Sequence, residues 1–92
     1  TWKALLQQFE IYLRLERALL PQTIAAYTQD LSRLWRFLQL DYAHIQPQGV
    51  TPQHLQAFLA HLHTTGISAT SQARMLAGLR AFFKFLLNHP SF

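Results

Sequence analysis

Four stretches of the sequence carry apolar residues at the alternating three- and four-residue spacing that places them on one face of a helix. The stretches cover about residues 2–17, 21–38, 52–65 and 69–88, and the longest segment without this period is 40–50. None of them shows the two-residue alternation typical of a half-buried strand. The pattern therefore predicts an all-α fold, a bundle of four amphipathic helices.

The residues between these stretches fit helix ends. Pro21 and Pro52 suit the first turn of a helix, where the missing N–H is not needed. Thr51 and Ser68 stand where a side-chain oxygen can cap a helix, and Gly66 suits a left-handed end to the third helix. Local chemistry and periodicity therefore agree on where each helix begins.

The composition is that of one small folded domain. The chain has 92 residues, half of them hydrophobic and 13% charged, so a single core is expected. There is no cysteine, which excludes disulfides and thiolate metal sites, and no apolar run reaches the roughly 18 residues of a membrane span. Because the chain starts at Thr1 rather than Met, and Pro90 is expected to stop the last helix, both ends are expected to be cuts from a longer protein.

A basic balance points to a polyanionic partner. Eight Lys and Arg residues oppose four Asp and Glu residues, giving a net charge of +4. The second and fourth stretches concentrate this charge on the face opposite their apolar stripes, where small residues alternate with basic and amide side chains. Those faces hold Gln22, Ala25, Ala26, Gln29, Arg33 and Arg36, with Asp30 toward the edge, and Thr70, Ala73, Arg74, Ala77, Ala81 and Lys84, with Arg80 at the margin.

Such faces suit a DNA duplex. Small side chains let a helix approach closely, arginine and lysine neutralise phosphates, and glutamine and arginine reach base edges. The alternative is two ordinary solvent faces filled with good helix formers, among which alanine is the best.

The residues that most often carry chemistry are scattered. His61 and His63 point to different sides of a helix, and no Asp, Glu or Cys ligand lies near them, so we expect no metal. We also expect no cofactor, because no glycine-rich phosphate loop or nucleophile–base pattern is present. Glu16 falls on the apolar side at the end of the first helix, where pairing with an arginine is expected.

Four segments, in order, resemble the N-terminal core-binding domain of tyrosine recombinases of the Xer and phage-integrase family. Residues 9–17 resemble its opening helix with the ending "LERGLS", and residues 23–31 its "T…Y..DL..F..FL" helix. Residues 50–59 are similar to "vt..dl..fla", and residues 66–86 to "GLS..T..R.LSALRSFF.FL". Two departures are Leu20-Pro21-Gln22 in place of Ser-x-x, and Gly78 where serine is common.

The resemblance implies a SAM-like orthogonal bundle that forms half of a C-shaped clamp on DNA. The second and fourth helices would cross the major groove of one recombination half-site. It places contacts at Gln22, Thr23, Ala25, Ala26, Thr70, Ser71 and Arg74. Arg74 is the first choice for a base or phosphate, and we add Gln29, Arg33, Arg36, Arg80 and Lys84 as further DNA contacts, the basic ones mainly to phosphates.

The resemblance also implies that catalysis resides elsewhere. The family's tyrosine nucleophile and Arg/Lys/His cluster belong to a C-terminal domain, and this chain has no His-x-x-Arg. Tyr12 and Tyr27 lie on apolar stripes and Tyr42 in a loop, so residues 1–92 are expected to be one inactive DNA-binding domain. The whole protein would cut and rejoin DNA through a phosphotyrosyl link, without metal or ATP. It would act as a tetramer of protomers on DNA, in the cytoplasm at the nucleoid.

Two other functions remain open at this point. One is a helix-turn-helix regulator built from the third and fourth helices around Gly66, although the fourth helix is long and strongly apolar for a recognition helix. The other is a protein-interaction bundle with no role in DNA binding. We expect neither a membrane nor a small-molecule partner.

Overall fold

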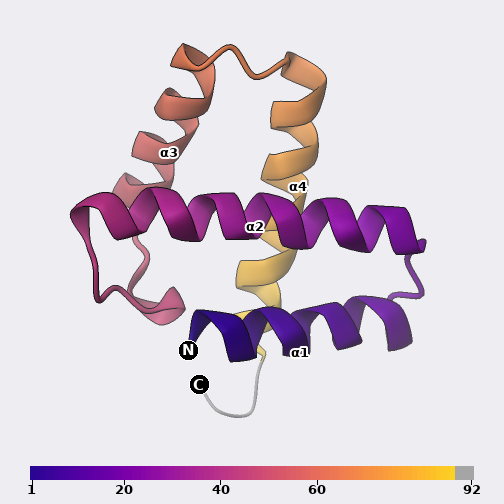
Figure 1. Ribbon diagram of the computed structural model, residues 1–92. Coiled ribbons are helices and arrows are strands. Elements are labelled where there is room, and N and C mark those ends of the chain that lie inside the picture. Colours follow the sequence, from indigo (N-terminus) through magenta and orange to yellow (C-terminus); the bar gives the residue numbers. More distant parts are fainter. Residues whose placement is uncertain (89–92) are drawn as a thin grey trace.

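The computed structural model describes residues 1–88, which form four α-helices and one short 3₁₀ helix (Figure 1). They are α1 (Trp2–Leu15), α2 (Pro21–Asp41), η1 (Pro47–Gly49), α3 (Pro52–Thr64) and α4 (Ala69–Leu87). The predicted all-α fold is confirmed, and α2 runs three residues further than expected. Pro90, the expected stop for the last helix, lies outside the described residues.

The central helix α2 packs against each of the other three helices. Figure 1 shows α1 alongside α2 in the opposite direction, while α3 and α4 stand steeply across it. This crossing makes the bundle orthogonal rather than a set of near-parallel helices. One face of α2 is therefore left outside the helix stack, close to the first turns of α4.

The helix starts follow the predicted caps. The Thr51 hydroxyl accepts the backbone N–H of His54, and the Ser68 hydroxyl accepts that of Ser71. Gly66 adopts a φ of +79°, the left-handed conformation expected after α3. The reciprocal bond from the Thr51 N–H to His54 Nδ1, 2.9 Å long, completes a capping box.

The core is built from the predicted apolar stripes, and aromatic rings join its helices. Phe9 of α1 meets Phe82 of α4 edge to face at 5.2 Å, and Trp2 stacks on both Phe82 and Trp35 at 6.2 Å. The Trp2 indole also donates to the Ile45 carbonyl at 2.8 Å, which ties the first turn of α1 to the α2–α3 connection. Trp2, Phe9, Phe58 and Phe82 are buried in this core, whereas Trp35 and Phe83 are half-buried at its edge.

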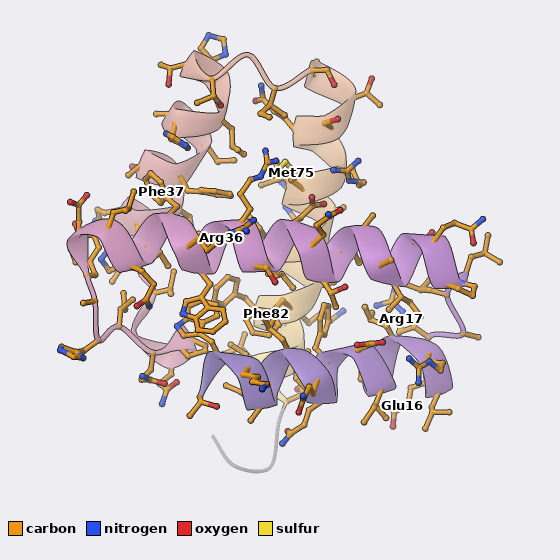
Figure 2. All side chains as sticks on the ribbon, viewed as in Figure 1. Glu16, Arg17, Arg36, Phe37, Met75 and Phe82 are labelled. Atoms are coloured by element: carbon orange, nitrogen blue, oxygen red, sulfur yellow. The ribbon has the colours of Figure 1, made fainter. Side chains whose placement is uncertain are left out.

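The end of α1 differs from the expectation. The helix stops at Leu15 rather than Arg17, and Ala18 takes a φ of +51° as the chain turns toward α2. Glu16 is exposed at this end (Figure 2) and, within residues 1–88, forms no ion pair. The expected pairing of Glu16 with an arginine is therefore wrong: the pair on α1 joins Glu10 to Arg14 at 2.7 Å, one helical turn apart.

Candidate nucleic-acid interface

A polar cleft lies where α2 passes the start of α4. Its volume is about 370 Å³. Five residues singled out from the sequence line it together, and Asp30 and Ser68 add further polar groups. The five are Gln29, Arg33 and Arg36 from α2, with Ser71 and Arg74 from α4. We call this the α2–α4 cleft; Figure 2 labels two of its lining residues, Arg36 on α2 and Met75 on α4.

The floor of the α2–α4 cleft is an ion pair between Asp30 and Arg74. Arg74 Nε donates to Asp30 Oδ2 at 2.9 Å, and Arg74 Nη2 donates to Asp30 Oδ1 at 3.0 Å. The Asp30 side chain is only 8% exposed, whereas that of Arg74 is 45% exposed. The hydrogen bond to Asp30 and then its negative charge raise the pKa of Arg74, against a smaller effect of burial. Arg74 is therefore a fixed cation at every working pH.

This pairing was not anticipated from the sequence. Asp30 falls at the edge of the helical wheel, and it lies 44 residues from Arg74 along the chain. No local pattern links the two residues, because only the crossing of α2 and α4 brings them together. The electrostatic consequence is that Asp30 balances one of the three arginines lining the described part of the cleft, so Arg33 and Arg36 supply its excess positive charge.

The remaining candidates on α2 lie on its first two turns. Gln22 and Ala25 are exposed, while Thr23 and Ala26 are half-buried. Ala25 also borders a small hollow shared with Glu10 and Arg14 of α1, so this end of the face is flanked by an ion pair. One side of α2 leads from this end into the α2–α4 cleft, because steps of three and four residues join Gln22, Ala25, Gln29, Arg33 and Arg36.

The candidates on α4 fall into two groups. Thr70 is exposed on the first turn, next to the cleft residues Ser71 and Arg74. Arg80 instead borders an apolar hollow between α4 and Leu55 and Leu59 of α3. Lys84 is exposed in the last turn, and at 1.5 Å per residue it lies about 21 Å along the helix from Thr70.

Two of the histidines, His54 and His61, have local structural partners. His54 completes the capping box of α3, and its ring lies 4.5 Å from that of Tyr42. The ring of His61 lies 5.0 Å from that of Phe37. Residues 1–88 contain no group of three His, Cys, Asp or Glu side chains placed to hold a metal ion. Over the same range, no helix is long and apolar enough to cross a membrane.

The profile of the family described as "Phage integrase, N-terminal SAM-like domain" matches residues 6–89. This chain belongs to that family. The phage-integrase SAM-like domain is similar to Tyrosine recombinase XerD of Chlorobaculum tepidum, with 36% identity over 94% of this chain and 28% of the relative. It is also similar to Tyrosine recombinase XerC of Pseudomonas savastanoi pv. phaseolicola, with 37% identity over 88% of this chain and 27% of the relative.

A third relative is Tyrosine recombinase XerC of Chlorobaculum tepidum, with 32% identity over 90% of this chain and 26% of the relative. This SAM-like domain thus spans about a quarter of the length of the curated relatives it matches. No solved structure matches it significantly. The resemblance seen in the sequence segments is confirmed at the level of the family.

Proposed function

We propose that this SAM-like domain binds double-stranded DNA through α2 and α4. The observation that carries the proposal is the convergence of two helices on one cleft lined by Arg33, Arg36 and Arg74. Each helix contributes polar or basic side chains that the sequence had placed on its outer face. The cleft residues come from chain segments about 40 residues apart, so no single helix accounts for the positive surface.

The physical case rests on shape and on charge. The exposed Ala25 on α2 and Ala73 on α4 keep the side-chain layer thin, which lets each helix backbone come near a duplex. Arg33 and Arg36 are exposed and suit phosphate contacts, which supply most of the non-specific affinity for DNA. Gln22, Thr23, Ala26, Gln29, Thr70 and Ser71 extend this proposed surface.

Arg74 has a different place in the proposal. It sits at the cleft with a fixed side chain, which suits a base edge or one defined phosphate. Arg80 and Lys84 lie outside the cleft, and they stay proposed phosphate contacts at the flank of the duplex. In this proposal the positive charges that contact DNA come from both ends of α4, with Arg74 near its start and Lys84 in its last turn.

For the whole protein we propose the role of a site-specific tyrosine recombinase. In it, residues 1–92 form the N-terminal clamp domain, and a separate C-terminal domain carries out strand exchange through a phosphotyrosyl link. Other protomers bound to the same DNA would be its protein partners, in the cytoplasm at the nucleoid. The matched relatives, named tyrosine recombinases and about four times as long as the matching segment, support this assignment.

The experiment is an amide NMR titration of the chain with a generic duplex, first at low salt and then at rising salt. DNA binding by α2 and α4 predicts chemical-shift changes at residues 22–36 and 70–84. These changes should fade as salt increases, because salt cations compete with the protein for the DNA phosphates. Shifts limited to α4 and its preceding turn would instead favour a helix-turn-helix regulator. Unchanged spectra at low salt would contradict DNA binding and favour a protein-interaction bundle.

A further inference from the structure

We propose that Asp30 is a positioning residue for DNA recognition: it holds the Arg74 guanidinium by its Nε–Nη2 edge and so presents the neighbouring Nη1–Nη2 edge to a pair of acceptor atoms on DNA. The inference rests on the proposed DNA binding and deepens it. It assigns a function to a buried carboxylate that lies on a surface expected to attract polyanions.

The geometry of the ion pair defines the free edge. A guanidinium has five N–H groups in a planar fork. Asp30 takes the Nε–H and one Nη2–H, with bonds of 2.9 and 3.0 Å. Within residues 1–88 no hydrogen bond engages Nη1. The second Nη2–H and one Nη1–H are therefore left as a parallel pair at the end of the guanidinium, on the edge next to the one that binds Asp30.

Burial gives the pair a direction. Asp30 is anchored in the middle of α2 with its side chain 8% exposed, whereas the Arg74 side chain is 45% exposed and borders the α2–α4 cleft. The carboxylate thus forms the inner side of the pair and the guanidinium the outer side. Arginine loses much rotamer freedom when it binds, and a side chain already fixed by two bonds has less left to lose.

The free edge selects a type of ligand. Two parallel N–H groups match two acceptors at a fixed spacing, a geometry offered by O6 and N7 of guanine and by two oxygens of a phosphate. Both sources present the same chemistry to Arg74. They differ in whether recognition depends on the base sequence.

If Asp30 acted only through its negative charge, removing that charge would strengthen DNA binding, whereas the positioning role predicts weaker binding. The direction of the change therefore distinguishes the two. Asp30 cancels one positive charge near the proposed DNA surface, so its neutralisation should strengthen binding to any duplex. Positioning predicts that neutralisation weakens binding. Asp30→Asn separates the two, because the amide removes the charge and offers Arg74 only one acceptor oxygen.

The matched control is Asp41→Asn. Asp41 ends the same helix, is exposed, and undergoes the same chemical and charge change away from the cleft. We expect Asp30→Asn to weaken binding to a randomised duplex pool by about fivefold or more, and Asp41→Asn to leave it unchanged or stronger. In an Arg74→Ala background, Asp30→Asn should cause no further weakening, since its effect passes through Arg74. Equal or tighter binding of Asp30→Asn than of Asp41→Asn would overturn the inference.

Sequencing the bound pool separates the two sources. A loss confined to duplexes with one preferred base pair identifies a guanine edge, while a uniform loss identifies a phosphate. Either result supports positioning.

Asp30→Asn also removes an ion pair that joins α2 to α4, so the substitution changes the fold's stability as well as the Arg74 side chain. A second measurement therefore uses the unaltered chain. In guanidinium NMR spectra, a saturating duplex should shift the Arg74 Nη1 protons and leave its Nε–H in place. Nη1 signals that do not move would overturn the positioning role even if the duplex binds. If no duplex binds the unaltered chain at low salt, the proposed DNA binding itself fails, which is a separate result.

Discussion

Gly78 of α4 lies beneath the ring of Tyr27 of α2, so closely that a Cβ atom on Gly78 would be 3.2 Å from Tyr27 Cδ1 and 3.3 Å from Cγ. Gly78 is buried at this crossing. A side chain at this position would press on the Tyr27 ring, so glycine allows α2 and α4 to approach closely. The same two helices form the α2–α4 cleft.

Enlarging Gly78 should separate the two helices. We expect Gly78→Val to reduce the free energy of unfolding by about 1–3 kcal/mol, since the methyl groups must displace a packed ring. Urea unfolding followed by circular dichroism measures this loss. Ala77→Val, on the exposed side of the same turn, should cost only about 0.6 kcal/mol of helix propensity. An equal loss of unfolding free energy in the two variants would show that the contact with Tyr27 does not restrict the size of residue 78.

Ala18 stores strain that a glycine would release. Its φ of +51° lies in the left-handed region, which costs a residue with a Cβ about 1 kcal/mol. We therefore expect Ala18→Gly to raise the free energy of unfolding by about 0.5–1 kcal/mol, measured by thermal unfolding. Ala60→Gly, at an exposed site within α3, should have the opposite sign, and a loss in both variants would refute the strain at Ala18.

The capping box of α3 should tolerate glutamine but not alanine. The Thr51 hydroxyl accepts the His54 N–H at 3.3 Å, and His54 Nδ1 accepts the Thr51 N–H at 2.9 Å. Thr51→Ala should cost about 1 kcal/mol of stability. His54→Gln retains an acceptor of the kind found at this position and should cost less than His54→Ala. Thermal unfolding of the three variants ranks them, and a His54→Gln protein no more stable than His54→Ala would contradict this role.

A negative charge on the outer face of α4 should weaken DNA binding without unfolding the domain. Ala73 is exposed one residue before Arg74, and glutamate is a good helix former. We expect Ala73→Glu to weaken duplex binding by about tenfold or more, because a carboxylate would face phosphates. The matched control is Ala57→Glu on the exposed side of α3. Fluorescence anisotropy with a labelled duplex compares them, and equal affinities would remove α4 from the interface.

Arg33 and Arg36 should account for part of the salt dependence. Each alanine variant should lower affinity by a similar factor for all duplex sequences and reduce the slope of log K against log salt by about one. Lys3→Ala, on the first turn of α1, should leave the slope unchanged apart from a small effect of net charge. The measurement is a set of binding isotherms at four salt concentrations. If the Arg33→Ala variant kept the same slope of log K against log salt as the unaltered chain, Arg33 would be excluded as a phosphate contact.

The sequence was sufficient for the helices because their signals are local. Apolar spacing, Pro21, Pro52 and Gly66 act within a few residues, and each predicted start was confirmed. The end of α1 was misplaced because nothing in the identity of Ala18 indicates a positive φ. The Asp30–Arg74 pair and the Gly78–Tyr27 contact were missed for another reason: both depend on how two distant segments cross.

The candidate site shows the same limit. A helical wheel places Arg74 and Lys84 on one face of α4, but it ignores distance along the axis, which separates the first turn from Lys84 by about 21 Å. It also set Arg80 at the margin of that face, whereas the structure places it beside α3. The helical wheel therefore identified the residues around the cleft. It could not separate them from residues such as Lys84, which point the same way but lie several turns away along the helix.

The stacked pair of Trp2 and Trp35 supplies a built-in optical reporter. Both tryptophans of the chain are in this pair, with ring centroids 6.2 Å apart, and neither lines the α2–α4 cleft. Their emission should therefore follow the docking of α1 onto the bundle and remain nearly silent when the cleft is occupied. A fluorescence signal that changes on mixing with a duplex would report a rearrangement where the first turn of α1 packs on α2.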